Sequence, residues 1–221
     1  MKMAQMDKDY FDKLAQTIVD CDKEACVHLV KEGLEKGADP LEMISQGLGK
    51  GIRKVGDDFG AGWCFLPELI GAADAMKEGV AILDEKIKAS GKTRKSLGRI
   101  VIGTVKGDIH DIGKSVVAAV LQANGYDVVD LGTDVEEERF IKAVNEYKAD
   151  CVAMSSLLTL TIRVMGTVIE KLKEAGVRNK VKVIVGGAPV TQEFADEIGA
   201  DAYGRDAADA VHKMAILLGR K

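Results

Sequence analysis

From Arg99 to the C-terminus, short apolar runs alternate with segments of helical periodicity. The runs predict five strands, at residues 99–103, 126–130, 151–154, 181–185 and 201–203. The segments between and after them predict five helices, at residues 112–124, 135–148, 161–175, 191–198 and 207–218. Strand and helix units of this length are typical of a parallel sheet covered by helices on both faces. Few other architectures are built from strands and helices that alternate in this way.

Right-handed crossovers reduce the possible strand orders to a few. For five strands we expect the order 2-1-3-4-5 of flavodoxin-like, Rossmann-like domains. In that order, strands one, three and four are neighbours, and ligands bind at the carboxyl ends of the strands beside the switch point. The loops that follow these three strands should therefore line one crevice.

The chain before this region is helical. Apolar residues recur with helical period in four segments, and Asp39-Pro40 and Leu66-Pro67 begin two of them. Four amphipathic helices with short connections predict a small bundle over residues 1–90. Residues 91–98 are polar and basic, which suits a linker, and residues 99–221 would form the second domain.

Composition excludes several classes of protein. A net charge of −4 among 221 residues offers no surface for nucleic acid. We find no apolar run of membrane-spanning length and no signal-peptide region at the N-terminus. The four cysteines lack CxxC spacing, so we expect reduced thiols in a cytoplasmic protein.

The loop after the first predicted strand carries the pattern Asp108-x-His110-x-x-Gly113. A carboxylate two residues before an imidazole can hold one ring nitrogen and leave the other free for a metal. A flexible glycine-rich loop with a solvated histidine is the alternative.

The loops after strands three and four carry residues suited to a large ligand. Ser155, Leu157, Thr159 and Thr161 follow strand three, and Gly186-Gly187 ends strand four. Hydroxyls offer hydrogen bonds, and glycines allow a bulky group to approach the backbone. Taken singly, these residues are also typical of helix caps and turns.

An aromatic cluster, Trp63-Cys64-Phe65-Leu66-Pro67, lies in the turn before the fourth helix. Turns are usually polar because they lie on the surface. Either these residues fold back on their own bundle, or they cover an apolar ligand held by the second domain.

Together, Asp108-x-His110-x-x-Gly113, Ser155-x-Leu157 and Gly186-Gly187 resemble the signature of cobalamin-binding domains. The stretch from Thr104 to Lys114 is similar to cobalamin-dependent methionine synthase. A four-helix cap containing Gly62-x-x-Phe65-Leu66-Pro67-Glu68, followed by a Rossmann-like domain, resembles the small corrinoid proteins of methyltransferase systems. The resemblance covers nearly the whole chain.

The resemblance implies a role for each matching residue. His110 would be the lower axial ligand of cobalt, Asp108 would accept the other imidazole proton, and Thr161 would complete this relay. The resemblance also implies a set of residues that would contact the cofactor: Lys106, Gly107, Ile109, Asp111, Ile112, Gly113, Ser155, Leu157, Thr159, Gly186 and Gly187. Phe65 and Leu66 match the cap over the upper cobalt face, although Trp63 and Cys64 depart from the expected pattern there.

The resemblance also implies a function. The protein would be a non-catalytic methyl carrier that cycles between cob(I)alamin and methylcob(III)alamin. Its partners would be a substrate-specific methyltransferase, a second methyltransferase with a folate or thiol acceptor, and a reductive activator. Nothing in the chain names the methyl donor, which could be methanol, a methylamine, a betaine or a methoxylated aromatic compound.

Two other functions are compatible with parts of the pattern. A cobalamin-dependent sensor would need an output module, and no helix-turn-helix remains unassigned. A phospho-acceptor receiver domain would need an aspartate after strand three and a lysine after strand five, where the chain has Met154-Ser155 and Tyr203-Gly204-Arg205.

Overall fold

The computed structural model describes residues 8–89 and 96–219. The chain divides into two compact units, whose main parts are these two ranges. Residues 91–95 of the predicted linker lie outside the described residues. Each unit is described by itself.

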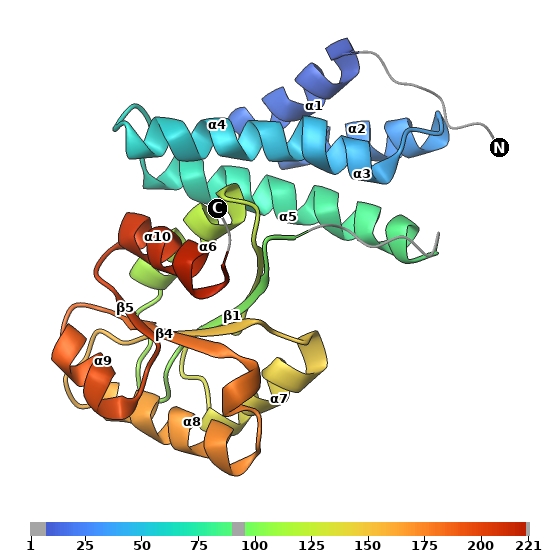
Figure 1. Ribbon diagram of the computed structural model, residues 1–221. Helices are drawn as coiled ribbons and strands as arrows, with labels where there is room; N and C mark the ends of the chain where they lie inside the picture. Colours follow the sequence, from blue (N-terminus) through green and yellow to red (C-terminus); the bar gives the residue numbers. More distant parts are fainter. Residues whose placement is uncertain (1–7, 90–95, 220–221) are drawn as a thin grey trace. The chain divides into compact units, whose positions relative to one another are not determined.

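The first unit is all helical (Figure 1). Its helices are α1 (Lys8–Val19), α2 (Lys23–Glu35), α3 (Pro40–Glu42), α4 (Gly49–Gly60) and α5 (Leu66–Ala89). A π-helical segment, Met43–Leu48, joins α3 directly to α4, so that these form one continuous rod. The unit therefore has the four helical rods that the apolar periodicity predicts.

Small residues allow the helices of this unit to pack closely. A Cβ on Gly33 of α2 would lie 2.0 Å from the Tyr10 hydroxyl of α1. A Cβ on Gly51 of α4 would lie 2.4 Å from the backbone oxygen of Ala15. At the start of α3, the Asp39 carboxylate accepts a hydrogen bond from the Leu41 backbone N–H, as expected of an N-cap before proline.

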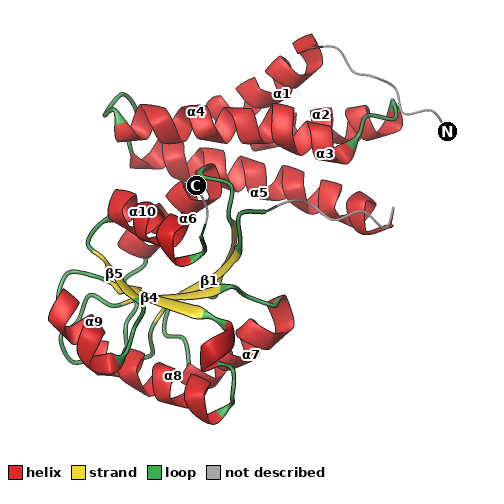
Figure 2. Ribbon diagram, in the orientation of Figure 1, coloured by secondary structure: helices red, strands yellow, loops and turns green. Residues whose placement is uncertain are grey.

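The second unit contains a five-stranded parallel sheet (Figure 2). Its strands are β1 (Arg99–Thr104), β2 (Asp127–Asp130), β3 (Cys151–Ser155), β4 (Lys182–Gly186) and β5 (Ala202–Gly204). Their order is β2-β1-β3-β4-β5, which confirms the predicted topology. The carboxyl ends of β1, β3 and β4 are neighbours in this order.

Helices cover both faces of the sheet (Figure 1). On one face, α6 (Ile112–Ala123) and α10 (Ala207–Leu217) pack through Leu121, Ala210 and Met214. On the other, α7 (Glu137–Tyr147), α8 (Ile162–Glu174) and α9 (Gln192–Ile198) pack through Phe140, Met165 and Ala195. A short 3₁₀ helix, Arg178–Lys180, precedes β4. Within the described ranges, no helix is both long and apolar enough to span a membrane.

Candidate functional site

The second unit has a pocket of about 710 Å³ at the carboxyl ends of its strands. Its floor includes Ile102, Ala153 and Ile184, which lie side by side on β1, β3 and β4. One row nearer the strand ends, Ser155 and Gly186 are paired across β3 and β4, and both line the pocket. The pocket therefore has an apolar floor and a small, polar rim.

His110 lies at this pocket, and Asp108 lies buried next to it. The His110 backbone N–H and ring Nδ1 lie 3.0 and 2.7 Å from Oδ1 of Asp108. A carboxylate only accepts hydrogen bonds, so Nδ1 carries the proton, and in the neutral imidazole Nε2 then has a lone pair. The imidazole is 48% exposed, and among the described residues no partner of Nε2 is found. Nε2 is therefore available to a metal.

The other oxygen of Asp108 holds the loop after β3. Oδ2 accepts hydrogen bonds from the backbone N–H groups of Leu157, at 2.7 Å, and Leu158, at 3.1 Å. It also accepts one from the Ser156 hydroxyl, at 3.0 Å. Burial by itself raises the pKa of the Asp108 carboxyl, but the hydrogen bonds from His110, Leu157 and Ser156 outweigh it and hold that pKa well below its ordinary value.

The backbone of the β1–α6 loop is held at both ends. Gly107 has a φ of +81°, which glycine adopts without strain, and its N–H donates to the Asp134 carboxylate at 2.7 Å. The Thr104 hydroxyl donates to the backbone oxygen of His110 at 2.9 Å. These contacts fix the position of the imidazole.

Two family models cover most of the chain. Residues 98–212 match a B12 binding domain, and residues 10–84 match a second model that is also described as a B12 binding domain. The chain belongs to the B12-binding corrinoid proteins. Cobalamin is accordingly the cofactor, which confirms the prediction from the sequence.

Several corrinoid proteins are similar to this chain over nearly its full length. Trimethylamine corrinoid protein 2 of Methanosarcina mazei is 46% identical over 91% of this chain and 93% of its own length. Dimethylamine corrinoid protein 2 of Methanosarcina acetivorans is 44% identical over 96% of this chain and 97% of its own. A chain in the crystal structure of the methanol:cobalamin methyltransferase complex from Methanosarcina barkeri matches with a TM-score of 0.83 and 35% identity, over 96% of this chain and 81% of that chain.

The residues at the pocket of this corrinoid protein fit cobalamin. The imidazole of His110 is the kind of nitrogen ligand that suits a transition metal such as cobalt. Gly113 lines the pocket, and a Cβ built on it meets no atom within 4 Å, so a larger side chain would occupy pocket space. The apolar floor can take an organic group, as small-molecule sites generally do.

The structure brings most of the predicted cofactor residues to one place. The predicted cofactor residues that line the pocket are Ile109, His110, Asp111, Ile112, Gly113, Ser155, Leu157, Gly186 and Gly187. Asp108 lies buried beside them. Their roles toward cobalamin remain predictions.

Four other residues predicted for the cofactor site do not line the pocket. Lys106 is exposed, and its Nζ lies 2.7 Å from Oε2 of Glu136. Thr159 is exposed, and neither it nor Gly107 is among the pocket residues. The hydroxyl of Thr161 lies 3.3 Å from Oδ2 of Asp108, the oxygen that does not contact His110.

The glycines at the end of β4 serve a purpose in addition to the one that we expected. A Cβ on Gly187 would lie 1.8 Å from the backbone oxygen of Ser156, and one on Gly186 would lie 2.8 Å from that of Gly204. Gly187 also has a φ of +123°. These glycines therefore allow segments of the protein's own backbone to approach one another, besides lining the pocket.

The two aromatic side chains of the cluster in the first unit do not pack against its helices. Trp63 is 82% exposed and Phe65 is 72% exposed, so the interpretation as bundle packing is wrong for these two side chains. Cys64 and Leu66 are partly buried, and Cys64 Sγ lies 3.6 Å from the backbone oxygen of Val55.

Sequence reasoning missed two residues at the site. Ser156 has no exposed surface and contacts Asp108, but it lies between the two residues of the Ser155-x-Leu157 pattern. Lys114 lines the pocket with only 2% of its side chain exposed and forms an ion pair with Asp130. Lys114 directly follows the Asp108-x-His110-x-x-Gly113 motif, which was a signal, but its partner Asp130 lies 16 residues further along the chain.

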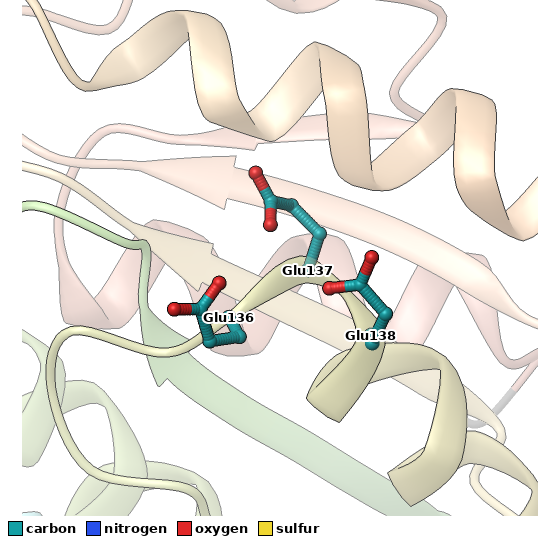
Figure 3. Close-up of side chains that lie close together, drawn as sticks. All are labelled: Glu136, Glu137 and Glu138. Carbon is teal, nitrogen blue, oxygen red and sulfur yellow. The ribbon is translucent and has the colours of Figure 1, made fainter.

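A second group of carboxylates, Glu136, Glu137 and Glu138, lies at the start of α7 (Figure 3). Lys106 pairs with Glu136, and Lys171 pairs with Glu137 at 3.8 Å and also with Glu138. Because each of these carboxylates already pairs with a lysine, we assign them no metal.

Proposed function

We propose that His110 binds the cobalt of cobalamin as its lower axial ligand, and that the protein carries a methyl group between two methyltransferases. The observation that supports this most directly is the ring of His110, tied through Nδ1 to buried Asp108 and open at Nε2. Bound cobalamin would supply a cobalt centre that accepts a methyl group and later releases it.

The chain itself would bind, orient and hold protons around the cofactor. Asp108 holds the imidazole with its proton on Nδ1, which directs the Nε2 lone pair outward. The loop N–H groups of Leu157 and Leu158 keep Asp108 ionised and in place. The floor of the pocket excludes water through Ile102, Ala153 and Ile184.

The upstream partner we propose is a methyltransferase for a small methylated compound. The relatives are corrinoid proteins named for trimethylamine and dimethylamine, and the structural relative is part of a methanol:cobalamin methyltransferase complex. A second methyltransferase would pass the methyl group to a thiol or folate, and a reductive activator would restore the cofactor. Transfer of label from methylated protein to a thiol or a folate, each with its own methyltransferase, tests this part.

Electron paramagnetic resonance of the cobalt(II) form tests the axial ligand. We expect nitrogen coupling from imidazole in the wild-type protein and its loss in His110→Ala. The other two histidines, His28 and His212, are matched controls, because neither lines the pocket. Their alanine variants should keep the coupling. Nitrogen coupling that survives in His110→Ala would refute the assignment.

A further inference from the structure

Asp108 has a second side-chain partner besides His110 that the sequence motif does not identify. The hydroxyl of Ser156 lies 3.0 Å from Oδ2 of Asp108, and the hydroxyl of Thr161 lies 3.3 Å from the same oxygen. Hydrogen bonds between two oxygens usually measure 2.5–3.0 Å, so the Ser156 distance lies within the normal range and the Thr161 distance lies beyond it. Ser156 is therefore the direct hydroxyl partner of Asp108.

Thr161 has closer partners than the carboxylate. Its hydroxyl lies 2.7 Å from that of Ser156 and 3.0 Å from the backbone oxygen of Leu158. Each hydroxyl has one proton to donate. When Ser156 donates its proton to Asp108, its oxygen is left to accept the proton of Thr161. The shortest contacts thus form a chain from Thr161 through Ser156 to Asp108 and His110.

The surrounding backbone holds Ser156 in this position. Its N–H donates to the backbone oxygen of Gly186 at 3.2 Å, and the side chain has no exposed surface. Gly187 allows the backbone oxygen of Ser156 to approach to a distance that any Cβ would prevent. Because hydrogen bonds hold both the backbone and the hydroxyl of Ser156 in place, Ser156 can keep the Asp108 carboxylate in one orientation.

We propose that Ser156 is a positioning residue of the cobalamin site, and that Thr161 acts on Asp108 through it. The hydroxyl of Ser156 holds Oδ2 of Asp108 so that Oδ1 remains directed at Nδ1 of His110. This inference rests on the proposed role of His110 as a cobalt ligand.

Nitrogen NMR of the imidazole in the cofactor-free protein gives a test that does not depend on cobalamin. In the wild-type protein, we expect His110 to carry its proton on Nδ1. Ser156→Ala should lower the population of this tautomer. Thr161→Ala should lower it less, and Thr161→Ser should leave it unchanged, because serine retains the hydroxyl. Thr167→Ala, at an exposed position on α8, is the matched control.

The cofactor-bound protein gives a second measurement. Loss of a residue that orients a metal ligand commonly lowers metal affinity or activity about 10- to 100-fold. We expect Ser156→Ala to lower cobalamin affinity by about 10-fold and to change the nitrogen coupling of the cobalt(II) form. Ser156→Cys, which retains the side-chain volume with a weaker donor, should fall between alanine and wild type. Thermal melting confirms that each variant is folded.

Two results would overturn the inference. If Ser156→Ala leaves both the tautomer and the affinity unchanged, Ser156 only fills the loop. If Thr161→Ala has the larger effect, Thr161 contacts Asp108 directly. An absence of nitrogen coupling in the wild-type protein would instead refute the proposed axial ligand, and the NMR measurement would still decide whether Ser156 positions His110.

Discussion

At the scale of single residues, Asp108 joins two loops that are distant in sequence. Its carboxylate accepts hydrogen bonds from His110 on one side and from Leu157 and Leu158 on the other. Hydrogen bonds to a charged group contribute about 1.5–3 kcal/mol each, so we expect Asp108→Asn to lower the free energy of unfolding at pH 7 by about 2 kcal/mol or more. Denaturant titration measures this difference.

The difference should depend on pH. The folded-state pKa of Asp108 lies below its unfolded value, so its ionised form stabilises the fold above the unfolded value, near 3.9. That contribution is lost as the pH falls through the folded-state pKa. Wild type and Asp108→Asn should therefore converge in acid, while the exposed Glu197→Gln serves as a control. A difference that stays constant from neutral to acid pH would contradict this account.

At the scale of elements, the end of β4 determines how closely the β3 loop can approach. A Cβ on Gly187 would lie 1.8 Å from Ser156 O, and the φ of +123° disfavours any other residue. We expect Gly187→Ala to lower the free energy of unfolding by about 3 kcal/mol or more, because strain and steric overlap combine. Gly199→Ala is the matched control, with a φ of +73° and open space, and should cost about 1–2 kcal/mol. If Gly187→Ala and Gly199→Ala lower the free energy of unfolding equally, the close approach of Gly187 to Ser156 does not contribute to stability.

At the scale of the whole molecule, the predicted cofactor contacts come from two units. The pocket with His110 belongs to the second unit, and Phe65 belongs to the first. If Phe65 covers bound cobalamin, as the resemblance implies, Phe65→Ala should lower affinity about 10-fold or more, since burying this side chain contributes about 1.5–3 kcal/mol. Titration with cobalamin measures the change, and Ile216→Ala, equally apolar and 64% exposed, is the control. Unchanged affinity in Phe65→Ala would remove Phe65 from the predicted cofactor contacts.

The sequence by itself predicted the main helices and strands, the strand order and the sheet edge at which the pocket lies. Strand and helix periodicities are local, and crossover handedness leaves few topologies, so the order β2-β1-β3-β4-β5 followed from them. The Asp108-x-His110 spacing also predicts a hydrogen bond within one loop, which the structure contains. These features depend on residues that are close together in the chain.

Only the tertiary structure decided which residues contact Asp108 from the other loop. Ser156 and Thr161 both carry hydroxyls, and their order of distance to Oδ2 depends on how the β3 loop packs against β1 and β4. The exposure of Trp63 and the π-helical turn at Met43–Leu48 are likewise known only from the folded structure. Side-chain contacts of this kind depend on close packing in three dimensions, and residue spacing along the chain does not encode them.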